Sequence, residues 1–437
     1  MKRFFDSRIG LVTASAIVLC TAARHTDARP IVGATIGGEP QRSTAPAPKR
    51  QRNDRTPIIP RQTDPGERTG KSEGKHKLEK STVYIGTYTG GDSKGIYIYR
   101  LALTSGELTP DGAAPFVESP SFLAVDSSHH YLYAVNESAS VGPEHAGLVS
   151  AFAIAPKTGA LKLLNQESSR GSGPCHISID SHAKHVLVAN YNSGSIAVLP
   201  ILVGGKLGPA TSFVQHTGSS VDPDRQKEPH AHSIYPDPNN HFVLSADLGI
   251  DKVLVYRYDA AKGNISPDDP PFAAVAPGSG PRHIAFHPNG HFVYVVNEMF
   301  SSVTAFTYDA SKGTLKDIQT VPALPTDFKG VDTAAEIAVH PNGKFLYSSN
   351  RGSDTIAIFT IDIQTGKITP AGHQSTQGKG PRHFIIDPTG IYLIAANQDS
   401  DNVVVFRIDE RSGALTPTGH SITLPKPVCV IVLPAGK

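Results

Sequence analysis

Residues 280–297 read GPRHIAFHPNGHFVYVVN, and the same pattern returns at residues 173–190 and 380–397. In each copy a Gly-Pro pair precedes an apolar run, a turn follows, and a second apolar run ends in Asn. Short apolar runs between turn residues predict β-strands, and no long segment shows the 3.6-residue period of a helix. The pattern therefore predicts an all-β repeat protein.

The polar residue that ends the second apolar run marks the repeat along the chain. Successive markers lie 47 to 57 residues apart, and they are Thr87, Asn136, Asn190, Asp247, Asn297, Asn350 and Asn397. A period of about 50 residues that holds four short strands is typical of a propeller blade. We therefore expect residues 81–437 to form a single seven-bladed β-propeller.

The two ends of this region are predicted to share one blade. No inner strand precedes Thr87, whereas residues 427–432 (PVCVIV) align with residues 281–286 (PRHIAF). We expect the C-terminal strand to complete the blade that Ser81 begins, because a closed ring leaves no open sheet edge.

Composition excludes several classes of protein. No stretch approaches the ~18 apolar residues of a membrane span, which excludes a polytopic membrane protein. The three cysteines provide neither a disulfide framework nor the spacing of a structural zinc site. Residues 81–437 carry 25 Lys and Arg against 31 Asp and Glu, a balance that disfavours nucleic acid as a partner.

The N-terminal residues have a different character. Residues 1–23 combine a basic start, an apolar stretch and small residues, which predicts a secretory signal peptide or, alternatively, an uncleaved N-terminal anchor. Residues 24–80 are basic and Pro-rich and lack Phe, Trp and Tyr, which predicts a disordered linker. We expect a periplasmic or secreted protein if the first segment is a cleaved signal, and a cytoplasmic protein otherwise.

Polar and charged residues stand where the inner strands of the propeller are expected to line the central channel. On those strands they are His176, His230, His232, Arg282, His283, Glu336, Arg382 and His383, and at the ends of the second strands they include Asp247, Glu298 and Arg351. Arginines beside histidines repel one another unless a bound anion or facing carboxylates compensate. The pattern predicts an anion-binding functional site.

Two other interpretations concern the same residue types. The Asn and Asp markers can satisfy backbone groups in turns, which we expect of Asn136, Asn190 and Asn397. Five further histidines lie beside turns and are expected to face solvent: His185, His241, His287, His291 and His340.

A metal site is a weaker interpretation of these residues. His230 and His232 would share one face of a strand, and Glu298 or Glu336 would add a carboxylate. The surrounding arginines oppose a dication, so we expect no metal and no cofactor. The chain also has no Gly-x-Ser-x-Gly elbow, P-loop or dinucleotide-binding turn.

The chain resembles the lactonase family of seven-bladed propellers, which includes propeller-type 6-phosphogluconolactonases and fungal carboxy-muconate cyclases. The resemblance runs from Val83 to about Pro434, and its motifs include YIGTYT (84–89), GPCH (173–176), PHAHS (229–233), GPRH (280–283), SNRG (349–352) and NQDSDNV (397–403). It implies hydrolysis of a lactone ring, most often of 6-phosphoglucono-1,5-lactone to the aldonate in glucose oxidation.

The resemblance also implies roles for single residues. The His, two Arg and Glu of the muconate-cyclising relatives correspond to His232 (or His230), Arg282, Arg351 and Glu298. In hydrolysis, His232 or Glu298 would take a proton from water, and the two arginines would stabilise the oxyanion or hold an anionic group. The expected substrate-binding residues are His176, Arg225, His230, Asp247, His283, Glu336, Arg382 and His383, with Arg225 and Arg382 as candidates for a substrate phosphate.

Other functions remain open at this point. An exported protein would meet an unphosphorylated sugar lactone or another small lactone rather than a cytoplasmic sugar phosphate. A muconate-type cyclase or isomerase would use the same site. A non-catalytic binding propeller would use the ring as a platform.

Overall fold

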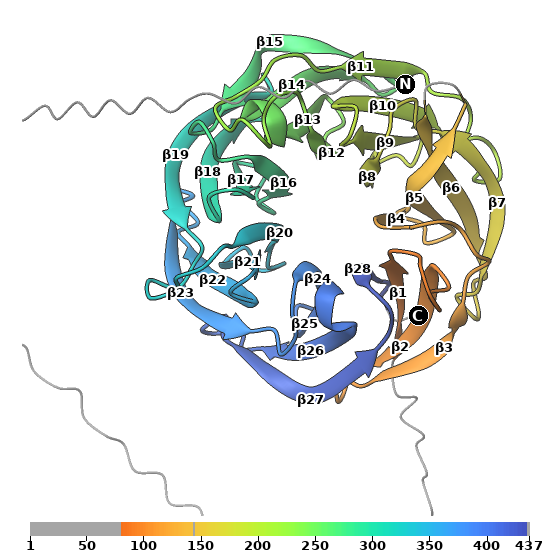
Figure 1. Cartoon of the computed structure of the whole chain (residues 1–437), viewed down its shortest axis with the longest axis vertical. Helices are drawn as coiled ribbons and strands as arrows, with labels where there is room; N and C mark the ends of the chain where they lie inside the picture. Colours follow the sequence, from red (N-terminus) through yellow and green to blue (C-terminus); the bar gives the residue numbers. More distant parts are fainter. Residues whose placement is uncertain (1–79, 143–144, 435–437) are drawn as a thin grey trace, which may run out of the picture. The chain divides into compact units, whose positions relative to one another are not determined.

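The computed structural model describes residues 80–142 and 145–434, in which the regular secondary structure is almost entirely β-strand. Seven four-stranded antiparallel sheets surround a central axis (Figure 1), which confirms the predicted all-β, seven-bladed propeller. The signal or anchor predicted for residues 1–23, and the linker predicted for 24–80 except Lys80, lie outside the described residues. In the described part of the chain, no helix has the length and apolar character needed to cross a membrane.

Each blade is listed here from its inner strand outward. Blades 1 to 4 are β28 (Pro427–Val432), β1 (Lys80–Thr87), β2 (Ile96–Ala102) and β3 (Leu108–Ala113); β4 (Leu123–Val125), β5 (Tyr131–Val141), β6 (Ala146–Ile154) and β7 (Leu161–Ser168); β8 (Pro174–Ile179), β9 (His185–Asn190), β10 (Ser195–Pro200) and β11 (Ser212–Gln215); and β12 (Ala231–Pro236), β13 (Phe242–Asp247), β14 (Lys252–Asp259) and β15 (Asn264–Ala274). Blades 5 to 7 are β16 (Pro281–Phe286), β17 (Phe292–Asn297), β18 (Ser302–Asp309) and β19 (Thr314–Pro322); β20 (Thr333–Val339), β21 (Phe345–Arg351), β22 (Thr355–Ile361) and β23 (Ile368–Ser375); and β24 (Pro381–Ile386), β25 (Tyr392–Asn397), β26 (Asn402–Ile408) and β27 (Leu415–Thr423). Two short 3₁₀ helices, η1 (Leu248–Ile250) and η2 (Gln398–Ser400), follow β13 and β25.

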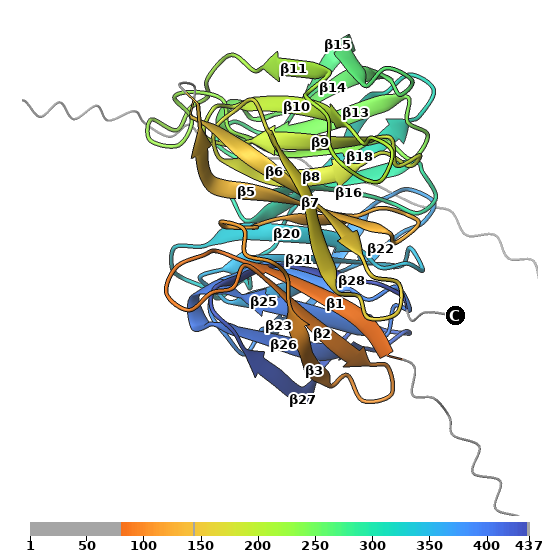
Figure 2. The same ribbon diagram turned by 90° about the vertical axis from the view of Figure 1, so that its right-hand side faces the viewer.

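The ring closes between the two ends of the described chain. The last strand, β28, lies beside β1 (Figure 2) and pairs antiparallel with it. The register runs from Val83 opposite Val432 to Gly86 opposite Cys429. This pairing confirms that the C-terminal strand completes the first blade. Without this pairing, β1 would be the unpaired inner edge of its blade.

The apolar core is divided among the interfaces between blades. Within the described residues, seven clusters of buried side chains each combine two neighbouring blades. At the closure, for example, Val83 of β1 packs with Ile394 of β25 and Val403 of β26. The alternating strand sequences supply an apolar face to each neighbour, so every blade is stabilised from both sides.

A glycine at the turn between the third and fourth strands makes the same contact in every blade. Each has a positive φ and lies against a side chain of the preceding blade; the seven are Gly106, Gly159, Gly205, Gly263, Gly313, Gly366 and Gly413. At Gly366, an added Cβ would lie 2.3 Å from the ring of Phe292. Beside this contact, the buried Tyr294 hydroxyl donates to the Gly366 carbonyl over 3.1 Å. The turn glycines therefore allow the blades to approach closely.

The prediction that the turn histidines face solvent is wrong for three of the five. His287 Nε2 donates to the Gly343 carbonyl over 2.8 Å, and His340 Nε2 donates to the Gly390 carbonyl over 2.9 Å. His185 is buried and lies 3.0 Å from Asp180. Each of the three contacts the turn of the next blade, so they link blades; His241 and His291 are exposed as expected.

Replacing Gly366 with Ala tests this contact between blades. We expect a loss of roughly 2–5 kcal/mol in the free energy of unfolding, because a methyl group meets Phe292 and the φ of +72° is strained for alanine. Urea denaturation measures the change.

The matched control is Gly290→Ala, whose φ is +74° but whose added Cβ has no neighbour within 4 Å. Its loss contains only the backbone strain, of about 1 kcal/mol. Equal losses in the two variants would contradict the packing role of Gly366.

Candidate active site

Inner strands that carry candidate residues are interrupted by β-bulges near their starts. The pairing shifts register between Pro174 and His176, Ala231 and Ser233, Pro281 and His283, Ala334 and Ile337, and Pro381 and His383. A bulge inserts one residue and re-aims the side chains around it. The bulges therefore allow two successive residues, such as Arg282 and His283, both to contact polar partners on neighbouring strands.

Glu298, which directly follows β17, is the centre of a cluster of charged side chains, here called the upper layer of the site. Its Oε2 atom lies 3.1 Å from Arg282 Nε and 3.0 Å from Arg351 Nη2, and its Oε1 accepts from Arg225 Nη2 over 2.8 Å. His232 Nε2 lies 3.8 Å from Oε2. The structure thus brings together His232, Arg282, Glu298 and Arg351, the four predicted catalytic residues, and adds Arg225 from the loop between β11 and β12.

This arrangement fixes the charge of Glu298. Burial opposes its ionisation, but Arg351 and Arg282 outweigh that effect and lower its pKa to about 2. A carboxylate with so low a pKa is a weak base at neutral pH. We infer that Glu298 anchors the three arginines rather than taking a proton from water.

The arginines keep some of their donors available. Arg282 is 2 % exposed, and its Nη1 donates to the Ala335 carbonyl over 2.5 Å. Arg351 donates to the carbonyls of Thr333 and Ala334. Among the described residues, no hydrogen bond involves Arg282 Nη2 or Arg351 Nη1, so both retain donors for an anionic group.

His230 and His232 differ in their surroundings. His232 is buried, and burial together with Arg282 holds its pKa well below the usual range. His230 is partly exposed and stacks on the ring of Tyr191 at 4.5 Å, while its Nδ1 donates to the Tyr191 carbonyl over 3.0 Å. That hydrogen bond places the proton of neutral His230 on Nδ1 and leaves the Nε2 lone pair free.

Asp247 lies behind His230. It is fully buried, and its oxygens accept from the His230 backbone NH over 2.7 Å and pair with His216 Nδ1 at 2.6 Å. These partners place Asp247 as a support of the site. The amides of Asn136, Asn190 and Asn397 donate to backbone carbonyls, as expected of turn residues.

A lower layer of the channel holds four more candidates. Glu336 Oε2 lies 3.0 Å from His283 Nδ1 and 3.3 Å from His383 Nε2. The ring of Phe122 lies 4.4 to 5.5 Å from the rings of His176, His283 and His383. Burial raises the pKa of Glu336 and lowers that of each of these histidines, that of His383 to about 4. Burial therefore favours the uncharged form of each of these four groups.

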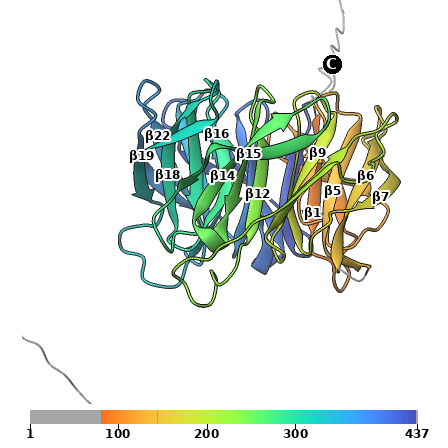
Figure 3. The same ribbon diagram turned by 90° about the horizontal axis from the view of Figure 1, so that it is seen from above.

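The mouth of the site opens beside Arg351 and Arg382. A pocket of about 410 Å³ is lined by Thr333, Arg351, Gly352, Asp354, Lys379, Gly380, Arg382, Gln398 and Asp399. Figure 3 shows the long loops between β11 and β12 and between β19 and β20 on one side of the ring, where the inner strands begin. Arg382 lies with its Cζ atom 5.3 Å from the centroid of the Tyr88 ring.

Three further residues lie at the site that were not among the predicted catalytic and substrate-binding residues. They are Tyr88, Glu137 and Tyr191, which follow β1, the Asn136 marker and β9. Each stands directly after a marker residue, at the position of Glu298 and Arg351 in blades 5 and 6, so the repeat alignment contains a signal for them.

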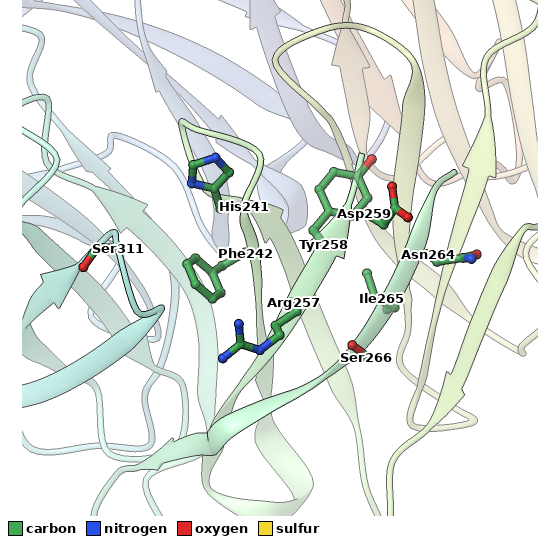
Figure 4. A pocket seen from close by; sticks show the side chains of 9 residues that line it. All are labelled: His241, Phe242, Arg257, Tyr258, Asp259, Asn264, Ile265, Ser266 and Ser311. Atoms are coloured by element: carbon green, nitrogen blue, oxygen red, sulfur yellow. The ribbon is translucent and has the colours of Figure 1, made fainter. Parts of the chain in front are cut away.

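A separate pocket on the outside of the ring contains none of these residues. Figure 4 shows a pocket on the outer strands of blade 4 and the adjoining turn of blade 5, lined by His241, Phe242, Arg257, Tyr258, Asp259, Asn264, Ile265, Ser266 and Ser311. Among the described residues, no group of three or more His, Cys, Asp and Glu is placed to hold a metal ion.

Replacing Glu298 with Gln tests its anchoring role. Three guanidinium groups would lose their carboxylate, and we expect a loss of about 3–5 kcal/mol in the free energy of unfolding at pH 7. The pKa of Glu298 is about 2 in the folded protein against an ordinary 4.5, so its ionised form stabilises the fold above pH 4.5. That stabilisation disappears as the pH falls toward 2, and urea denaturation from pH 7 to pH 3 should show the difference between variant and wild type shrinking.

Glu410→Gln, in an exposed turn, is the control and should match the wild type. A Glu298→Gln deficit that stays constant over this pH range would contradict the proposed charge state.

Comparison with known proteins identifies the family of the chain. The family model described as "Lactonase, 7-bladed beta-propeller" matches residues 82–432. A 6-phosphogluconolactonase of Bacillus subtilis is 36 % identical over 310 residues, which are 71 % of this chain and 86 % of the relative. A 6-phosphogluconolactonase of Formosa agariphila is 36 % identical over 312 residues, which are 70 % of this chain and 86 % of the relative. The solved structure of the Pseudomonas aeruginosa periplasmic gluconolactonase is 32 % identical, with a TM-score of 0.77 over 82 % of this chain and 100 % of that one. The chain therefore belongs to the lactonase family of seven-bladed β-propellers.

Proposed function

We propose that the protein hydrolyses a sugar lactone, with 6-phosphoglucono-1,5-lactone as the first candidate substrate. The observation that carries this proposal is the Glu298 cluster, in which three guanidinium groups surround one carboxylate beside His232. His230 joins the cluster through Tyr191, because it stacks on the Tyr191 ring while the Tyr191 hydroxyl accepts from Arg225. Hydrolysis of a lactone needs a proton acceptor for water and donors for the oxyanion, and this cluster contains both. The names of the relatives from Bacillus and Formosa support the same substrate.

His230 is the better proton acceptor of the two histidines. Its Nε2 lone pair is free because Nδ1 donates to the Tyr191 carbonyl. His232 is buried between Cys175 and Glu298, with distances of 3.7 Å from Nδ1 to Cys175 Sγ and 3.8 Å from Nε2 to Glu298 Oε2. We therefore assign His230 to water and His232 to the wall of the site, which refines the expectation from the family resemblance.

The reaction then balances with the residues of this chain. His230 Nε2 takes one proton as the water oxygen bonds to the lactone carbonyl carbon. The free donors of Arg282 and Arg351 stabilise the oxyanion. The carbon–ring oxygen bond then breaks, the imidazolium returns its proton to the ring oxygen, and the new carboxylic acid releases its proton to solvent.

The charge of the mouth suits a phosphorylated substrate. Four arginines and one lysine meet four carboxylates there, which leaves a net of one positive charge; the groups are those of Arg225, Arg282, Arg351, Arg382 and Lys379 with Glu137, Glu298, Asp354 and Asp399. A phosphate monoester carries close to two negative charges at neutral pH. Arg382 forms no hydrogen bond or ion pair with the described residues, so we assign it to the phosphate.

Location within the cell decides between two forms of this substrate. If residues 1–23 are a signal peptide, the protein meets an unphosphorylated lactone outside the cytoplasm. The Pseudomonas structure, named a periplasmic gluconolactonase, favours this second candidate. Its product would also enter carbohydrate metabolism, as an unphosphorylated aldonate.

Replacing His230 with Ala tests the proton acceptor. We expect turnover of either lactone, corrected for spontaneous opening, to fall by about 10²–10⁴-fold, because general base catalysis is lost. His232→Ala should lower turnover less. A pH-stat assay that follows acid release measures both.

The exposed His241→Ala variant of the same blade is the control. Full activity of His230→Ala together with an inactive, folded His232→Ala variant would transfer the base role to His232. No turnover of any lactone by the wild type would overturn the proposed hydrolysis and favour the binding platform or the cyclase.

Replacing Arg382 with Gln tests the phosphate assignment. We expect KM for 6-phosphoglucono-1,5-lactone to rise about 10- to 100-fold, since a charge-assisted hydrogen bond is lost, while KM for glucono-1,5-lactone stays within about twofold. Arg407→Gln, exposed on β26 of the same blade, is the control. Parallel changes for both lactones would place the phosphate elsewhere.

A further inference from the structure

Glu137 and Tyr88 form a second polar pair, on the side of the ring away from Glu298. The Tyr88 hydroxyl lies 3.0 Å from each Glu137 carboxylate oxygen, and both side chains are partly exposed. Glu137 follows Asn136 in blade 2 and Tyr88 follows β1 in blade 1, whereas Glu298 belongs to blade 5. The mechanism proposed above uses neither residue.

The backbone around Ser119 holds this pair in place. The Ser119 carbonyl accepts from the Glu137 backbone NH over 3.1 Å, and the Ser119 backbone NH donates to Thr89 Oγ1 over 3.0 Å. Ser138, the residue after Glu137, donates from its hydroxyl to Ser119 Oγ over 2.9 Å. One residue thus fixes the segments that carry Tyr88 and Glu137, which pre-organises the pair.

Tyr88 also separates Glu137 from Arg382. Its ring lies beside the Arg382 guanidinium at 5.3 Å while its hydroxyl donates to the carboxylate. No ion pair joins Glu137 to any Lys, Arg or His of the described chain. Arg382 also lines the pocket beside Arg351, so the Tyr88 ring connects Glu137 to the mouth of the site.

A carboxylate without a cation is unexpected where an anion is to bind. Its two oxygens have about four acceptor positions, of which the single Tyr88 hydroxyl uses part. The oxygens are suited to two adjacent hydroxyl donors, a feature that a polyhydroxylated lactone has and a plain lactone or a muconate lacks. Arg382, next to the pair, would hold the anionic end of the same molecule.

We propose that Glu137, held by Tyr88, is a specificity-determining residue that accepts hydrogen bonds from neighbouring hydroxyl groups of a polyhydroxylated lactone. This inference rests on the proposed function and narrows its substrate class, because it distinguishes aldonolactones from lactones without hydroxyl groups. Glu137 and Tyr88 contact the substrate away from the bond that breaks.

The test compares glucono-1,5-lactone with δ-valerolactone, which has the same six-membered ring without hydroxyl groups. In the full chain, Glu137→Gln should lower kcat/KM for glucono-1,5-lactone by about 10- to 100-fold and leave that for δ-valerolactone within about twofold. Tyr88→Phe should lower the ratio of kcat/KM for glucono-1,5-lactone to kcat/KM for δ-valerolactone to a smaller extent. Glu410→Gln is the control and should leave the ratio unchanged.

Parallel losses on both lactones, or no change with either, would overturn the proposal, because a structural role moves both substrates together. If the wild type opens neither lactone, binding of gluconate and of hexanoate is measured by calorimetry. This measurement tests the role of Glu137 separately from the proposed hydrolysis. Gluconate binding that weakens 10-fold or more in Glu137→Gln would support this assignment although hydrolysis had failed. Equal gluconate binding by both proteins would overturn it.

Discussion

The pairing of β28 with β1 is the constraint on which the rest of the molecule depends. These strands are more than 300 residues apart in the chain, yet their hydrogen bonds complete a sheet and close the ring. Each interface between blades has its own apolar cluster, and closure provides the seventh interface. A ring closed in this way holds seven inner strands around one axis. Residues that are distant in sequence therefore meet at the axis, although each belongs to a different blade.

The β-bulges convert this architecture into a site. A regular strand would place successive side chains on opposite faces, whereas the shifted register at Arg282 and His283 brings both into contact with polar groups of other strands. The charged residues collect near the start of the inner strands and the neutral histidines lie below them. This separation follows from burial. A buried guanidinium group keeps its charge and needs a carboxylate partner, whereas a buried imidazole loses its proton and becomes neutral.

The sequence predicts the fold nearly completely because the repeat is written in local signals. Apolar runs, turn residues and the markers depend only on neighbouring residues, and they establish seven blades and the closing strand. The same local view predicts exposed turns at His287 and His340, although their ring nitrogens donate to carbonyls some 50 residues away. The candidate site likewise divides into features that local sequence indicates and contacts between blades that it does not. Residue types and strand positions indicate the arginines and Glu298, but the Tyr191 carbonyl that orients His230 belongs to another blade.

The electrostatics of the site divide the chemical roles among its residues. Three arginines favour the ionised form of Glu298, while burial together with Arg282 favours the neutral form of His232, so both are poor proton acceptors near neutral pH. We therefore assign proton transfer to His230, which lies outside the buried cluster and whose Nδ1 donates to the Tyr191 carbonyl. A net positive mouth attracts any anion, including the product, and charge alone is a poor selector among lactones. Selectivity therefore requires a group that rejects plain anions, and a carboxylate that forms no ion pair within the described chain, as Glu137 is, meets that requirement.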